Sequence, residues 1–142
     1  MKNNIGESLI HSLKSNKVTQ IIGDLAEASL DNILDDGFIK ELPVFGTLLN
    51  IIKTGYSIRD KIFAKKILKF LIGSSGISSL EREDFFNRIN EDNNVNEKLG
   101  ETLIVLLDRI EDLTKAEMLG RAFKSLITNK LIMINSKDLR SS

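Results

Sequence analysis

The stretch that most constrains the fold is residues 42–73, the most apolar and also the most basic part of the chain. Its sequence is LPVFGTLLNIIKTGYSIRDKIFAKKILKFLIG, and it contains the only proline of the protein, Pro43. A proline suits the first turn of a helix, where no N–H is needed. Apolar residues then recur at helical spacing on most sides, which is typical of a helix in the middle of a bundle. We therefore expect residues 43–72 to form a central helical hairpin or one bent helix, depending on whether Gly55 breaks or bends it.

The rest of the chain carries helical patterns that would cover this segment. Strand signals are almost absent, and Ser78–Glu81 and Thr114–Glu117 have the residue order of capping boxes. The expected helices, besides the central segment, are a short and frayed one in 1–16 and longer ones over 17–35, 80–89, 95–113 and 115–129. On the 95–113 helix the core face would consist of Val95, Leu99, Leu103, Leu106, Leu107 and Ile110. The sequence predicts an all-α fold, a single compact bundle of five to six helices.

One domain is expected, because 142 residues can bury one core. The clearest linker is GSSGISS at residues 73–79, which separates a front half, 1–72, from a back half, 80–134. Residues 135–142 look like the start of another helix. This tail is either a short end or the point at which a longer protein has been truncated.

Composition excludes several kinds of site. There is no cysteine and one histidine, His11, so thiolate chemistry, zinc sites and paired-histidine metal centres lack their ligands. Asp92 opens an EF-hand-like run, but Glu97 and Leu103 stand where a calcium loop needs Gly and Glu. No phosphate-binding glycine loop occurs. We therefore expect no catalytic, cofactor-binding or metal-binding residues, no enzyme activity, no cofactor and no small-molecule substrate, with His11 as a surface residue.

The charge layout is uneven, although twenty basic and twenty acidic residues cancel overall. Residues 20–41 hold six acids against one lysine, a net charge of −5, and residues 53–69 hold six bases against one acid, a net charge of +5. One interpretation is that these neighbouring helices pack and their charges compensate. Another is that the basic helix faces an anionic membrane surface. Nucleic acid is the least favoured partner, since the aromatic residues here fit an apolar face better than a stacking platform. A further acidic cluster, Asp108, Glu111 and Asp112, ends the 95–113 helix, where the helix dipole disfavours it, and is either a solvated face or a partner site.

Apolar surface would remain around residues 45–52, and a second copy or a partner protein would bury it most simply. We expect a non-enzymatic protein-binding or assembly module, self-associating, in a bacterial or phage-related cytoplasmic system. The alternative is a protein that associates peripherally with the inner face of the membrane through residues 42–72. The candidate interface residues are Phe45, Leu49, Ile52, Tyr56, Arg59, Lys61, Lys65, Lys66 and Lys69.

Three segments together resemble an uncharacterised family of small helical bacterial proteins. They are LAEASLDNILDDGFIKELPVFGTLL, GYSIRDKIFAKKILKFL and KLGETLIVLLDRIEDLTKAEMLGRAF, between Leu25 and Phe123. The resemblance implies an all-helical fold and chains that are often longer than this one. It implies no activity and no functional residues.

Overall fold

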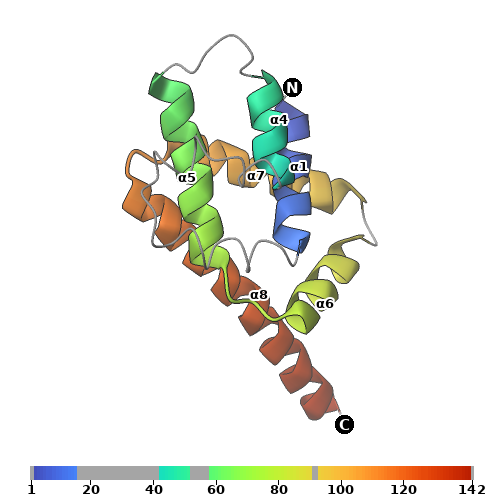
Figure 1. The fold of residues 1–142 in the computed structure, drawn as a ribbon. Coiled ribbons are helices and arrows are strands. Elements are labelled where there is room, and N and C mark those ends of the chain that lie inside the picture. Colours follow the sequence, from blue (N-terminus) through green and yellow to red (C-terminus); the bar gives the residue numbers. More distant parts are fainter. Residues whose placement is uncertain (1, 16–41, 52–57, 91–92, 142) are drawn as a thin grey trace.

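The computed structural model describes residues 2–15, 42–51, 58–90 and 93–141 (Figure 1). These parts of the chain are almost entirely helical and contain no strand, so the predicted all-α fold is confirmed. The expected helix over 17–35 and its acidic residues lie outside the described residues, as does Gly55. The helices are α1 (Lys2–Lys14), α4 (Pro43–Ile51), α5 (Ile58–Ser74), α6 (Ser79–Asn90), α7 (Asn93–Arg109) and α8 (Leu113–Ser141).

Helix α1 is a core element and not a frayed end. Its apolar residues Ile5, Leu9, Ile10 and Leu13 are all buried. It lies beside α4 and is crossed by α7 (Figure 1). The spacing of these four residues places them on one side of the helix, so α1 can contact both neighbours with that single side.

A serine of α1 fixes the start of α4. Pro43 occupies the first helical position, as expected, and the carbonyl of Leu42 accepts the first helical hydrogen bonds. Leu42 has no side-chain acceptor to cap the helix. The buried hydroxyl of Ser12 takes this role instead: it accepts from the Val44 N–H at 3.0 Å and donates to the Ser8 carbonyl at 2.9 Å. The hydroxyls of Ser8 and Thr47 also form a hydrogen bond between the same two helices.

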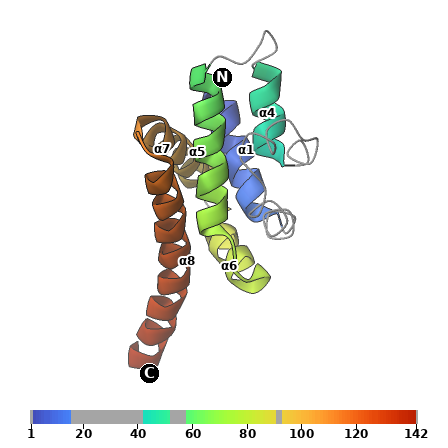
Figure 2. The ribbon, with the colours of Figure 1, turned by 60° about the vertical axis from the view of Figure 1, so that its left-hand side comes forward.

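Two helix pairs approach so closely that only glycine fits at the contact. Helices α5 and α8 run in the same general direction side by side (Figures 1 and 2). A Cβ on Gly73 or Gly120 would fall well inside 3.0 Å of a carbonyl oxygen of the other helix, closer than real Cβ atoms come. Where α7 crosses α1, a Cβ on Gly100 would lie 2.6 Å from the carbonyl oxygen of Gly6. These glycines set the distances between the helices that hold most of the core.

Helix α6 closes the core with aromatic side chains. Its start is the expected capping box: the Glu81 N–H donates to the Ser78 hydroxyl at 3.2 Å, and that hydroxyl donates to the Glu81 carboxylate at 2.8 Å. The Phe85 ring lies 5.3 Å from that of Phe86 and 6.0 Å from that of Phe123 on α8, between ring centroids. Both pairs are edge-to-face, the favoured geometry for aromatic contacts.

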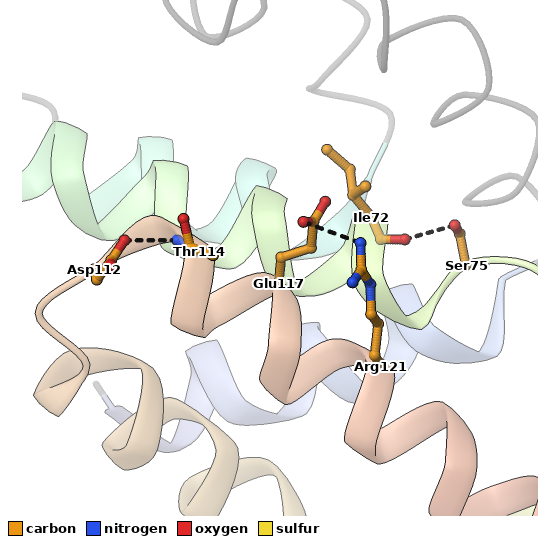
Figure 3. Close-up of polar contacts among 6 residues, drawn as sticks. All are labelled: Ile72, Ser75, Asp112, Thr114, Glu117 and Arg121. Atoms are coloured by element: carbon orange, nitrogen blue, oxygen red, sulfur yellow. Dashed lines mark hydrogen bonds and ion pairs between the residues drawn. The ribbon is translucent and has the colours of Figure 1, made fainter.

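The boundary between α7 and α8 differs from the expected one. Helix α7 ends at Arg109, and Asp112 caps α8, its carboxylate accepting from the Thr114 N–H at 2.8 Å (Figure 3). The capping residue is therefore Asp112, not Thr114. Because Asp112 stands at the start of a helix, its charge is favourable there, and the expected clash with the dipole at the end of α7 is wrong for this residue.

Helix α8 runs unbroken to Ser141, so the expected end near Asn129 and a separate helix in the tail are wrong. Its sequence explains this continuity, because neither glycine nor proline occurs after Gly120. Helix α5 likewise continues to Ser74, which shortens the linker to the residues before Ser79. Gly76, in that connection, has a φ of +90°, a conformation that suits glycine.

The core face of α7 is rotated relative to the expected one. Leu103 and Leu107 are buried as expected, and Ile104 is buried as well. Val95 and Leu106 are exposed. The contact between Gly100 and α1 explains the difference, because it brings the side of α7 around Leu103 and Ile104 against the core.

Helix α5 is central in the way the sequence suggests, but among the described helices α4 is not its principal packing partner. Ala64, Ile67, Leu68 and Leu71 of α5 are buried, and the principal neighbour of α5 is α8. Helix α4 packs mainly on α1. Residues 52–57, which would decide between a hairpin and a bent helix, lie outside the described residues.

Candidate binding surfaces

The basic residues of α5 form an outer face, with one exception. Arg59 and Lys61 are exposed, and Lys65 and Lys69 are half-buried. Lys61, Lys65 and Lys69 follow one another at four-residue steps, so they share one side of the helix. Ile62 is exposed beside them. The structure therefore places three of the predicted lysines, Lys61, Lys65 and Lys69, along one side of α5, with Arg59 exposed at the start of the helix.

Lys66 is the exception, because its side chain is only 8% exposed. Its ammonium donates to the main-chain carbonyl of Asp108 at 3.2 Å. The last carbonyls of a helix have no partner within the helix, and a cation is favourable at that end. Lys66 thus caps α7, and its inclusion in the candidate interface is wrong.

Phe45, the largest residue of the predicted apolar interface around α4, is not available to a partner. Phe45 is buried in the core of the chain itself, so a partner cannot cover it. The docking of the α4 start on Ser12 turns this side of α4 inward. The side chains of Leu49, Ile52 and Tyr56 lie outside the described residues.

An apolar row on α8 is the largest feature that the sequence patterns missed. Met118 is 58% exposed, Leu126 is 46% exposed, and Ala122 between them is exposed too. The three are four residues apart and form one row, which we call the α8 row. Within the expected 115–129 helix, Leu119, Ala122, Phe123 and Leu126 recur at helical spacing, which by itself predicts one shared core face. The α5–α8 contact at Gly120 turns Phe123 inward and leaves the α8 row outside.

Charged residues flank the α8 row. Lys115 and Arg121 are exposed. The Arg121 guanidinium pairs with the Glu117 carboxylate at 3.4 Å and reaches toward Ile72 of α5 (Figure 3). Arg121 is exposed and Glu117 is half-buried, so water still screens this pair, and it contributes at most about 1 kcal/mol to stability. The surface of α8 around the row is therefore apolar at its centre, with Lys115 and the Arg121–Glu117 pair at its margin.

Helix α8 also extends well past the other described helices (Figures 1 and 2). Its 29 residues correspond to a length of about 44 Å at 1.5 Å per residue. The sequence of the extending part includes the apolar run Leu131–Ile134.

The outer side of α7 carries a complementary pattern. Glu97, Glu101, Val105 and Asp108 are all exposed, and Val105 is 41% exposed. Their spacing of four, four and three residues places them on one side of the helix, which we call the α7 stripe. It contains three of the acids of the back half, including Asp108 of the predicted acidic cluster.

A shallow groove lies between α1 and the start of α7. It has a volume of about 330 Å³, and its lining includes the exposed His11, together with Glu7, Ile10, Lys14, Asn96 and Glu97. Among the described residues, no three His, Cys, Asp or Glu side chains lie close enough together to hold a metal ion.

Next to this groove, cations tie α6 to α1. The buried Arg82 guanidinium donates to the Ile77 carbonyl at 3.1 Å and to the Ser15 carbonyl at 3.4 Å. Burial lowers the pKa of Arg82 from its ordinary value. The Lys14 ammonium lies 5.6 Å from the centre of the Phe86 ring. These contacts explain how two segments far apart in sequence stay together. They are structural contacts and indicate no reaction or ligand for the groove.

Comparison with known protein families, with curated proteins and with solved structures finds no match. Within the described parts of the chain, none of the helices combines the length and apolarity needed to cross a bilayer.

Proposed function

We propose that this protein is a non-enzymatic, self-associating assembly module that binds through α8. The observation that carries the proposal is the exposed α8 row on a helix that continues past its neighbours. The absence of cysteine and the abundance of Asn, Lys and Ile support a cytoplasmic setting in a bacterium or phage-related system.

The energetics of a projecting helix support a partner. A helix of about 12–15 residues without packing neighbours is marginal in water. The end of α8 extends past the other described helices (Figures 1 and 2), where an associating helix could pack against it. Covering large apolar side chains such as Met118 and Leu126 contributes about 25 cal/mol for each Å² removed from water. Association along α8 would therefore stabilise both the row and the extension.

The test is the mass of the wild-type chain in solution by light scattering, compared with two variants. Met118→Glu places a charge in the α8 row, and we expect it to reduce the assembly to monomer. Leu80→Glu is the matched control, because Leu80 is 71% exposed but lies on α6. We expect Leu80→Glu to retain the wild-type mass. A wild-type chain that remains monomeric at all concentrations would refute self-association.

A second candidate is peripheral binding to an anionic membrane, favoured by the outer basic face of α5. Each lysine or arginine near such a surface contributes about 1 kcal/mol. Arg59, Lys61 and Lys69 are the residues to reverse, whereas Lys66 is buried and would report on folding. We expect binding of the wild type to vesicles to rise with their anionic lipid content and to disappear in the triple glutamate variant. Vesicles that fail to bind the wild type at low salt would exclude this candidate.

A further inference from the structure

We propose that the α8 row of one copy docks on the α7 stripe of a second copy. This inference rests on the proposed self-association and names the surface that receives α8. It makes the assembly heterologous, with a different surface contributed by each of the two copies in contact.

The two surfaces match in length. The α7 stripe runs from Glu97 to Asp108 and the α8 surface from Lys115 to Leu126, eleven residue steps in each case. At 1.5 Å per residue both are about 17 Å long. Each has an apolar part beside charged residues: three side chains, Met118, Ala122 and Leu126, on α8, and one, Val105, on α7. Helices pack by interdigitating such side chains along their length.

The charges around the α8 row and along the α7 stripe favour contact between these two different surfaces. The α8 row is flanked by exposed Lys115 and by Arg121, which pairs with Glu117, so its margin carries a net charge of +1. The α7 stripe contains the acids Glu97, Glu101 and Asp108, and with the exposed Lys98 and Arg109 beside it the net charge of this side of α7 is −1. Two α8 rows facing each other would bring together two margins of net positive charge, and like charges across an interface are unfavourable. Docking α8 on α7 instead places a net positive margin against a net negative stripe.

A contact of this kind leaves one free surface of each type at the ends of the assembly. A heterologous contact closes into a ring or continues as an open chain of copies, whereas a contact between identical surfaces stops at two copies. The assembly should therefore grow beyond a dimer with concentration unless it closes into a ring.

The experiment uses two full-length variants that each damage one surface. Met118→Glu puts a negative charge in the α8 row, which would face the acidic stripe. Val105→Lys puts a positive charge in the α7 stripe, which would face the basic margin of α8. Both positions are exposed and both replacements suit a helix, so we expect both variants to fold, as circular dichroism would check. We expect each variant alone to be monomeric.

Mixing the two variants then gives the decisive result. The Val105→Lys chain keeps an intact α8 row, and the Met118→Glu chain keeps an intact α7 stripe. The mixture should form one-to-one pairs that cannot grow further, visible as a single dimer mass by light scattering. Lys115→Glu and Glu101→Lys form a second pair of variants with the same expected behaviour.

The outcomes separate this inference from the proposed function. A wild type that assembles, with Met118→Glu monomeric but Val105→Lys still assembled, would overturn the docking of α8 on α7 and leave association through α8 intact. A mixture that stays monomeric would also overturn the inference. A wild type that never assembles would overturn the proposed function itself.

Discussion

Substituting Gly120 by Ala tests the closest contact in the fold. Gly120 lies inside α8, and alanine is the better helix former by about 1 kcal/mol, so propensity alone predicts a more stable protein. The structure predicts the opposite sign. A Cβ at this position would lie far too close to the carbonyl oxygen of Phe70, and only 2.9 Å from the Ser74 nitrogen and 3.0 Å from the Gly73 Cα.

The size of the loss in stability depends on which atoms the added methyl group would meet. Adding a methyl group to a packed site costs about 1–3 kcal/mol. All the obstructing atoms belong to the backbone of α5 and cannot rotate aside, so α5 and α8 must separate and the upper end of the range applies. Set against the gain in helix propensity, the net loss is about 2 kcal/mol. For a chain of 142 residues this corresponds to a fall in Tm of about 7 °C.

The assay is thermal and urea unfolding followed by circular dichroism, at one low protein concentration. Ala122→Gly is the control, because Ala122 is exposed on the same helix. At a concentration at which the chain is monomeric, its loss of about 1 kcal/mol reports propensity alone. If Gly120→Ala equals or exceeds the wild type in stability, α5 and α8 do not pack at this distance and the reasoning is refuted.

The remaining predictions concern polar contacts between helices. Ser12→Ala removes the hydroxyl that accepts from the buried Val44 N–H and should cost about 1–3 kcal/mol in urea unfolding, whereas Ser125→Ala, at an exposed position, should leave stability unchanged or slightly raised. Asp112→Ala should lower stability by about 1 kcal/mol because α8 loses its cap. Asp112→Asn keeps a hydrogen-bond acceptor and should retain most of the stability that the cap provides. Equal losses in both variants would argue against capping. Lys66→Met keeps the packed part of the side chain and should lose about 1 kcal/mol with the α7 cap. Lys66→Ala should lose more, and an equal loss would show that the stem contributes nothing.

Local signals in the sequence predicted the local parts of this structure. Pro43 marks the first turn of α4, and Ser78 with Glu81 forms the cap of α6, because both depend on residues within one helical turn. The contacts that position the helices are not local. Ser12 caps a helix that begins some thirty residues later, and Lys66 caps α7 by donating to a carbonyl forty-two residues later. A pattern within one helix cannot reveal either contact.

The candidate surfaces, like the helix contacts, were predictable only where spacing within one helix determines them. The basic side of α5 follows from lysines spaced four residues apart, and the structure places Lys61, Lys65 and Lys69 as expected. Periodicity assigned Leu126 to the core, because an exposed apolar row and a buried one have the same spacing. Only the close approach of α5 at Gly73 and Gly120 shows which side of α8 is turned inward. The burial of Lys66 depends in the same way on where α7 ends.

The most direct test of self-association through α8 is sedimentation velocity of the wild-type chain over a wide concentration range, with and without anionic vesicles. We predict species heavier than the monomer that increase with concentration, disappear in Met118→Glu and are unchanged by vesicles. A chain that stays monomeric at every concentration, and that sediments with the vesicles at low salt, would contradict assembly through α8 and assign binding to the basic face of α5.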